Sequence, residues 1–159
     1  PELLTQLQAT TQATEEIRTK IGADDWTKRE YKRIRREKLE QLLQLVIEID
    51  AWVQTARRHY VFSATEEPGR SPDARAKALQ RLYFPELKAV INAFGLKVGE
   101  LHILYMECGM RMSRHPDKGE QLAVVKEFEE AINQKQKELI HCRGAVELAI
   151  EALSPSLYE

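Results

Sequence analysis

The sequence predicts an all-α protein, an up-down helical bundle of three long helices plus a shorter N-terminal helix, folded as one domain over residues 1–159. Two observations lead to this class. Apolar residues recur at steps of three and four along most of the chain, which is the spacing of a buried helix face. Glycine and proline number only seven and six, which is typical of long helices joined by few turns.

The bundle is organised around a helix predicted over residues 27–62. Its segment 38–60 reads KLEQLLQLVIEIDAWVQTARRHY. A lone helix does not keep such an apolar face in water, so other helices must cover it. The predicted buried face consists of Leu39, Leu42, Val46, Ile49, Val53, Ala56 and Tyr60.

A shorter helix is predicted over residues 1–21, where Gly22 is a natural C-terminal stop. Thr27 and Glu30 are typical of a capping box that begins the next helix. Because the connection between the two helices is short, we expect them to pack as antiparallel neighbours. The face of the shorter helix consists of Leu3, Leu7, Thr10, Thr14, Ile17 and Ile21.

The polar segment 64–70 is the clearest loop in the chain. Ser71 as the cap and Pro72 as the first helical residue then begin a helix over 72–84. That helix ends where the ring of Pro85 would clash with the preceding turn, so a break or kink is expected at residues 83–84.

Two long helices are predicted after this break. The first runs from Pro85 to about Ser113, with the alternative that it ends at Gly95 and another helix begins at Lys97. A turn at 114–119 follows, where Asp117 and Glu120 resemble a capping box, and the last helix ends near residue 153, before Pro155. The predicted buried residues are Leu87, Ile91, Phe94, Val98, Leu101, Tyr105, Cys108 and Met112 in the first helix, and Leu122, Val125, Phe128, Ile132, Leu139, Val146, Ile150 and Leu153 in the second.

The overall composition narrows the functional classes. A formal net charge of -1 argues against the molecule as a whole being an electrostatic partner of DNA or an anionic membrane. No apolar run approaches the roughly 20 residues of a membrane-spanning helix. Cys108 and Cys142 are expected to be reduced thiols of a cytosolic protein, and a disulfide would require an oxidising compartment.

The strongest charge feature is the segment 28–38, KREYKRIRREK, in which seven of eleven residues are basic. One interpretation is a solvated helix whose charges pair with Glu15, Glu16, Glu30 and Glu37. The other is a binding site for anions such as acidic lipid headgroups, nucleic acid or an acidic protein. The candidate residues of that site are Lys28, Arg29, Lys32, Arg33, Arg35 and Arg36.

Side chains for catalysis or metal binding do not converge in this sequence. Glu138 and His141 have the Glu-x-x-His spacing of di-iron bundles, but the second such pair is missing. Met106, Met110 and Met112 suit either core filling or a pliable peptide-binding patch. We therefore expect no enzyme activity, no cofactor and no metal site.

One stretch resembles a group of uncharacterised bacterial helical proteins. In them a tryptophan opens a basic helix that continues into a Lys-Leu-Glu and Leu-Leu stretch, as in WTKREYKRIRREKLEQLL at residues 26–43. A short Thr/Glu-rich helix similar to TTQATEEIRTKI at residues 10–21 often comes before it. Many such proteins carry an N-terminal membrane-spanning helix, so the resemblance implies a tether upstream, and it implies no activity or site residues.

The expected function is a non-enzymatic interaction or scaffold domain in the cytoplasm, tethered to the inner membrane if a segment missing here supplies an anchor. Its partner is another protein or a second copy of the chain, and a homodimer that buries part of the 27–62 helix or the last helix is favoured. The alternative is a binder of nucleic acid or anionic lipid through residues 28–38, and a metalloprotein built on Glu138 and His141 comes last.

Overall fold

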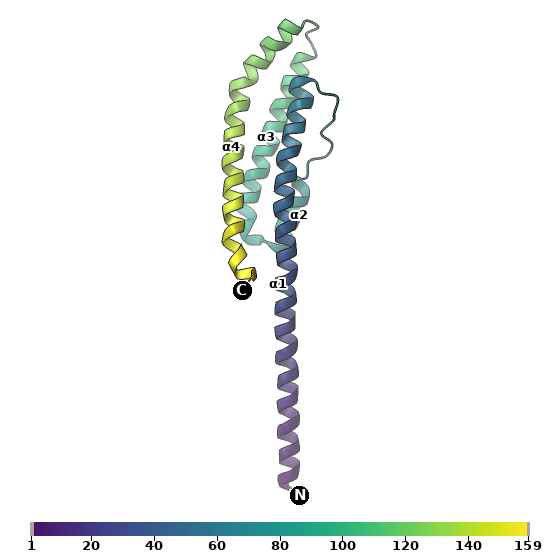
Figure 1. Cartoon of the computed structure of the whole chain (residues 1–159), viewed down its shortest axis with the longest axis vertical. Helices are drawn as coiled ribbons and strands as arrows, with labels where there is room; N and C mark the ends of the chain where they lie inside the picture. The colour runs from purple at the N-terminus through teal and green to yellow at the C-terminus, as the bar shows by residue number, and fades with distance from the viewer. Residues whose placement is uncertain (1, 159) are drawn as a thin grey trace.

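The computed structural model describes the backbone of residues 2–158 and the side chains of residues 12–158. This part of the chain is all-α, as predicted, and no strand occurs within it. Figure 1 shows α3 and α4 lying along the C-terminal half of α1, with the short α2 beside α1. The elements are α1 (Glu2–Phe62), α2 (Asp73–Tyr83), the 3-10 helix η1 (Pro85–Leu87), α3 (Lys88–Met112) and α4 (Lys118–Tyr158).

The predicted helix end at Gly22 is wrong, because α1 continues through it for 61 residues, roughly 90 Å. The predicted antiparallel packing of residues 1–21 on 27–62 is wrong for the same reason. A single glycine costs a helix only about 1 kcal/mol, which a long helix tolerates. Thr27 caps no new helix, since its hydroxyl donates to the carbonyl of Ala23 at 2.8 Å within α1.

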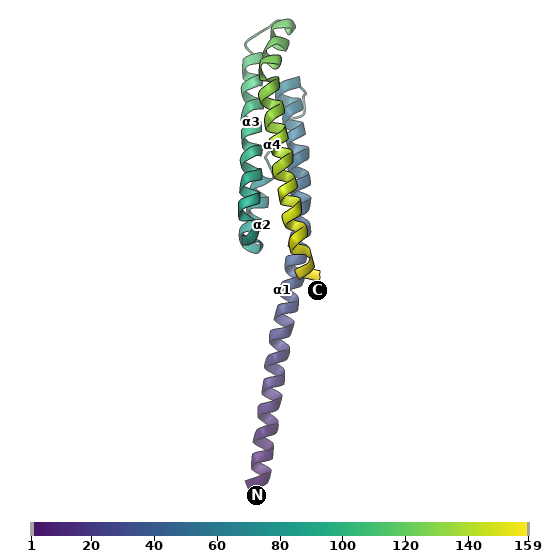
Figure 2. The same cartoon turned by 90° about the vertical axis from the view of Figure 1, so that its left-hand side faces the viewer.

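The N-terminal half of α1 extends beyond the bundle as a single helix (Figures 1 and 2). We call residues 12–34 the projecting segment, because all of its side chains are exposed except those of Glu30 and Ile34, which are half-buried. The bundle proper is therefore made of the C-terminal half of α1 with α2, α3 and α4.

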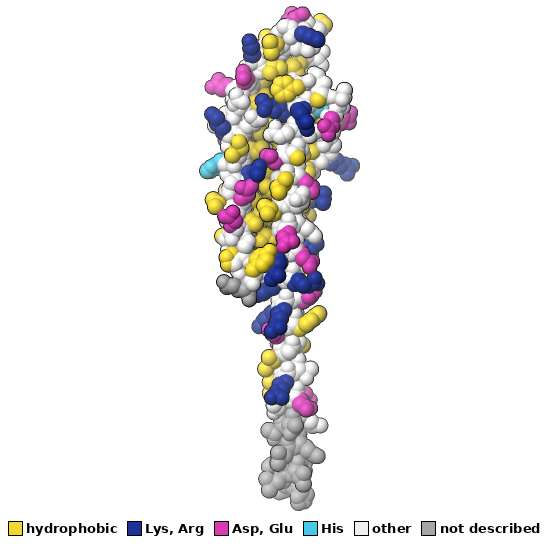
Figure 3. Space-filling model, viewed as in Figure 1, with side chains coloured by type: hydrophobic (Ala, Val, Ile, Leu, Met, Phe, Trp, Pro, Cys, Tyr) yellow, Lys and Arg dark blue, Asp and Glu magenta, His cyan; other side chains and the backbone are white. Residues whose placement is uncertain are grey.

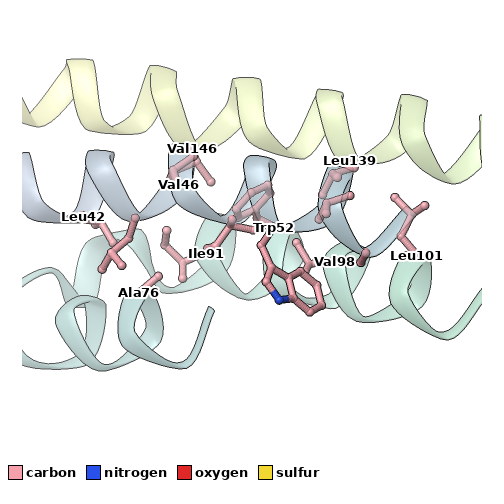
Figure 4. Close-up of a cluster of buried hydrophobic side chains, with 14 of the residues drawn as sticks. Leu42, Val46, Trp52, Ala76, Ile91, Val98, Leu101, Leu139 and Val146 are labelled. Carbon is pink, nitrogen blue, oxygen red and sulfur yellow. The ribbon is translucent and has the colours of Figure 1, made fainter. Parts of the chain in front are cut away.

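The core lies between these helices, and Figure 4 shows Leu42, Val46 and Trp52 of α1 pointing toward side chains of the other helices. The residues predicted on the face of α1 are buried, except that Tyr60 is half-buried. Leu45 and Trp52 are buried as well, so the apolar face of α1 is wider than the predicted stripe. This width lets α1 contact α2, α3 and α4 together.

The break before α3 is confirmed at the predicted place. α2 ends at Tyr83, and Phe84 leaves the helical conformation with φ -137° and ψ 62° while its side chain is fully buried. α3 then runs without interruption through Gly95, so the alternative of two helices is wrong. The eight residues predicted to be buried from Leu87 to Met112 are all buried.

The predicted capping chemistry is found only in part, because Pro72 and not Ser71 is the N-cap of α2, and Glu120 contacts His115 instead of returning a bond to Asp117. The first helical residue of α2 is Asp73, one residue later than expected, and its amide lies 3.4 Å from the Ser71 hydroxyl oxygen. Asp117 Oδ2 accepts hydrogen bonds from the amides of Gly119 at 2.8 Å and Glu120 at 3.1 Å. These bonds satisfy amides that the first turn of α4 leaves without a partner.

α4 departs from its predicted limits at both ends. Near its start Leu122 is 56% exposed and Val124 takes the buried position, while Val125 and Phe128 are half-buried. At the other end the helix passes through Pro155 and reaches Tyr158. The last turn persists because Leu157 is buried in the core, a tertiary gain that outweighs the hydrogen bond lost at the proline.

Four charged side chains join α3 to α4 on the bundle surface. Lys97 Nζ lies 2.8 Å from Glu138 and 2.9 Å from Glu100. Lys135 Nζ lies 2.9 Å from Glu100 and 3.2 Å from Glu138. Hydrogen bonds from Lys97 and then Lys135 lower the pKa of Glu138 to about 2. The carboxylate of Glu138 therefore forms ion pairs with two lysines.

This cluster predicts a specific loss of stability in acid. Since the pKa of Glu138 is lower in the folded chain than its ordinary value of 4.5, its contribution is present above that value and is lost as the pH falls toward 2. We expect Glu138→Gln to show a smaller fall in urea midpoint than the wild type between about pH 5 and about pH 2.5. Glu151→Gln is the control, because Glu151 is exposed on α4 and makes no ion pair with the described residues. Equal falls in wild type and Glu138→Gln would contradict the prediction.

Candidate interaction surface

The projecting segment carries large apolar side chains that no part of the described chain covers. Ile17 is 59% exposed, Ile21 63% and Tyr31 54%. The surface view shows apolar side chains along this part of α1 (Figure 3). A helix without tertiary contacts is marginal in water, because its stability normally comes from packing an apolar face. The segment therefore has the character of one half of an interface.

The exposed apolar residues lie on the side of α1 that is buried within the bundle, and in the projecting segment that side also carries Asp24 and Lys28, 18 residues before the buried Leu42 and Val46. Ile21 and Leu39 are 18 residues apart, as are Tyr31 and Ile49, and 18 residues are five turns of 3.6 residues. Each exposed residue therefore points to the same side of α1 as its buried counterpart. The bundle and the uncovered face of the projecting segment lie on one side of the helix, and the bundle simply stops before it reaches the segment.

Two of the six candidate basic residues are used in holding the fold together. Arg35 forms an ion pair with Glu86 of η1, and its guanidinium lies 5.1 Å from the centre of the Phe84 ring. Arg36 donates from Nη2 to the carbonyl of Leu157 at 2.8 Å, and its guanidinium lies 4.4 Å from the centre of the neighbouring aromatic ring, Tyr158. Both arginines are half-buried and fasten α1 to the end of the bundle.

Of the other four basic residues, two form ion pairs along α1 and two do not. Arg29 pairs with Asp25 at 2.7 Å, and Arg33 pairs with Glu30 at 2.5 Å and with Glu37 at 2.7 Å, all along α1. Lys28 and Lys32 are exposed one turn apart and make no ion pair within residues 12–158. Figure 3 shows Lys and Arg side chains gathered where the bundle meets the projecting segment.

Other groups singled out in the sequence do not come together. Within the part of the chain described, no three His, Cys, Asp or Glu side chains are placed to hold a metal ion, and His141 is exposed. Cys108 and Cys142 are both free thiols. Burial raises the pKa of the Cys108 thiol, so the reactive thiolate is disfavoured there.

The three methionines of α3 differ in exposure, although all three line one groove. Met112 is buried, Met106 is half-buried and Met110 is 57% exposed. Met106 and Met110 line a groove of about 480 Å³ between the ends of α1 and α3, together with Tyr60. Gly109 forms its floor, and a Cβ placed on it would lie 2.8 Å from the Tyr60 carbonyl oxygen. Sequence reasoning missed this close approach, because a glycine inside a helical register carries no sign of its neighbours.

No family model, curated protein or solved structure matches the chain. Among the described residues, no helix has the length and apolar content needed to cross a membrane.

The exposed face of the projecting segment was also missed as a site. Its signal was the three-and-four spacing of Ile17 and Ile21, which the sequence interpretation assigned to packing within the chain.

Proposed function

We propose that this chain is a non-enzymatic interaction domain, in which the bundle supports the projecting segment of α1 as a helix for pairing with another helix. The observation behind the proposal is that Ile17, Ile21 and Tyr31 are uncovered on the exposed segment of α1 that extends beyond the bundle. Burying a large apolar side chain contributes about 1.5–3 kcal/mol relative to leaving it exposed. A helical partner that covered this face would stabilise both the contact and the helix itself.

The shape of the chain suits this role. In the proposed function the bundle fixes α1 through its buried half, so that the projecting segment leaves the bundle in a defined direction (Figure 2). Arg35 and Arg36 hold α1 at the point where it leaves the bundle. A rigid support reduces the ordering cost of binding, because less of the helix must be fixed when a partner docks.

A photoreactive amino acid placed at position 21 in living cells tests the proposal. We expect cross-linking of the full-length protein from position 21, because a partner helix covers that side chain. The matched control is position 19, where Thr19 is exposed on the opposite side of the same turn. Equal cross-linking from both positions, or none from either, would rule out an interaction through this face.

A second candidate function rests on Lys28 and Lys32, which are exposed and without ion pairs in the described chain. We propose that these two lysines form a weak site for an anionic polymer or lipid surface, close to the point where α1 leaves the bundle. Arg35 and Arg36 are committed to the fold and contribute less than the sequence suggested.

Ion-exchange behaviour tests this second candidate. We expect the wild type to be retained on heparin at low salt, and the double variant Lys28→Gln/Lys32→Gln to elute at lower salt with a salt slope reduced by about two charges. Lys137→Gln removes an exposed charge from α4 and should change retention little. Failure of the wild type to bind at low salt would end this candidate.

A further inference from the structure

We infer that the projecting segment pairs with α3 of a second copy of this chain, in a two-fold dimer in which each segment lies antiparallel along α3 of the other copy. The inference rests on the proposed function and names the partner and the surface that it offers. It follows from a second uncovered apolar face, from the matched spacing of the two faces, and from the side of α1 on which the bundle lies.

α3 carries an apolar face on its outer side as well as on its buried side. Leu96 is 60% exposed, Ile103 52% and Met110 57%. Each of them comes two residues after a buried core residue, and two residues turn a helix by about 200°. Gly99 and Met106 lie between them at steps of three and four, so the five residues have the spacing of a helix that packs against one other helix. We call residues 96, 99, 103, 106 and 110 the outer seam of α3, which lies along the left edge of the bundle in Figure 2.

The projecting segment has the same spacing, and the two patterns match when the helices run in opposite directions. Setting Ile17 opposite Leu96 of the second copy brings the other positions of both faces into line. Ile21 is then opposite Asn92, and Thr14 is opposite Gly99, where no atom of the same chain lies within 4 Å of an added Cβ. The sequence continues the match with Leu3, Leu7 and Thr10, whose side chains lie outside the described residues, opposite Met110, Met106 and Ile103.

Charges beside this contact are complementary. Arg18 and Glu100 of the second copy lie on the same edge of the two antiparallel helices, and each side chain leans toward the N-terminus of its own helix, so the two lean toward each other. Asp24 lies beyond the outer seam and reaches the level of Lys88 of the second copy. Arg18, Asp24 and Lys88 are exposed and make no ion pair within residues 12–158.

The shape of the chain allows both contacts of the dimer at once. The uncovered side of the projecting segment is the side of α1 on which the bundle lies, so a second bundle docked there lies end to end with the first (Figure 1). Its outer seam faces the first copy, so its own α1 lies on its far side and sends its projecting segment back along α3 of the first copy. The contact uses the same two surfaces on both copies, and it therefore closes at two chains.

The register also leaves room for the two bundles. Arg35 marks the end of each bundle, where it pairs with Glu86. The register sets Glu86 of the second copy opposite residue 27 of the first, eight residues before Arg35. The ends of the two bundles are therefore about 12 Å apart along α1 and do not overlap.

Mixing two cysteine variants tests the register. In a Cys142→Ser background, Ile17→Cys and Leu96→Cys each add one accessible thiol, because Cys108 is buried. We expect a short bismaleimide to join the mixed variants into a product of twice the chain mass of 18.4 kDa. It should join neither variant to itself, since the two-fold axis keeps equivalent residues far apart. Thr19→Cys mixed with Leu96→Cys is the control, because position 19 lies on the opposite side of the same turn.

A charge placed on the outer seam tests the contact independently. We expect Leu96→Glu to dimerise at least about tenfold more weakly than the wild type in sedimentation equilibrium, because the contact would bury an unpaired carboxylate. Leu148→Glu is the matched control, since Leu148 is 68% exposed on α4, away from the seam. Melting is compared on dilute, monomeric chains, where it reports on the bundle alone, and equal midpoints exclude misfolding as the cause.

The outcomes separate this inference from the proposed function. Dimers of the wild type, joining of position 17 to position 96 only, and a weakened Leu96→Glu variant support pairing of the segment with α3. A wild type that stays at 18.4 kDa at every concentration, equal joining from position 19, or a Leu96→Glu variant that dimerises as well as the wild type would each overturn it. Cross-linking from position 21 to a different protein alone would overturn self-pairing and leave the proposed function standing.

Discussion

Phe94→Ala is expected to lower the free energy of unfolding by about 3–5 kcal/mol. Phe94 is 2% exposed and lies in the second turn of α3, which packs against both α1 and α4. Removing the ring loses its transfer free energy and leaves a cavity that helices held on several sides cannot close. The loss is large compared with the 5–15 kcal/mol by which most domains are stable.

Urea denaturation measures this effect, with Leu96→Ala as the matched control on the same helix. Leu96 is 60% exposed, so its truncation should cost less than about 1 kcal/mol. Comparable losses in the two variants would mean that α3 buries a different face. The burial of the seven predicted residues of α3 would then be wrong as well.

Gly109→Ala is expected to destabilise the bundle by about 1–3 kcal/mol, although alanine is the better helix former. The added Cβ would lie 2.8 Å from the carbonyl oxygen of Tyr60, a backbone atom that cannot rotate away. α1 and α3 must therefore move apart near their adjoining ends, which loosens the contact between them.

Gly99→Ala is expected to change the stability in the opposite direction, and it serves as the control. No atom lies within 4 Å of a Cβ placed at Gly99 in the same helix. We expect it to raise stability by about 0.5–1 kcal/mol through helix propensity alone. Thermal melting of both variants measures the difference, and a Gly109→Ala protein that is as stable as Gly99→Ala would show that α1 and α3 do not approach so closely.

The sequence predicted the bundle core well, because burial follows helical periodicity. The eight residues predicted to be buried between Leu87 and Met112 keep one register through Gly95 and Gly99, and all of them are buried. The register was less certain in α4, where Leu122 is exposed and Val124 is buried. Both residues are apolar, so only the position of α3 decides which of them faces inward.

Helix ends were predicted less well, because local signals compete with tertiary contacts. Gly22 and Thr27 have the chemistry of a stop and a start, yet α1 continues through both. Pro155 lies within α4 because Leu157 is buried and Arg36 donates a hydrogen bond to the carbonyl of Leu157. Those contacts join residues 121 positions apart, and no local pattern reveals them.

The sequence could not show which of the six candidate basic residues are bound within the fold. The basic residues were identified, but the partners that bind Arg35 and Arg36 into the fold come from η1 and the end of α4. The heptad-like spacing around Ile17 and Ile21 predicted a face packed within the chain, and the structure leaves both residues exposed. The spacing could not show that the rest of the chain lies too far along α1 to cover them.

Hydrogen exchange of the dilute wild-type chain tests most directly whether the projecting segment lacks a partner within the chain. We expect the amides of residues 12–34 to exchange much faster than those of the buried half of α1, because a helix segment without tertiary contacts is marginal in water. The amides of the buried half of α1 and of α3 should open only with the whole fold. Exchange in residues 12–34 that is as slow as in the buried half of α1 would contradict the account.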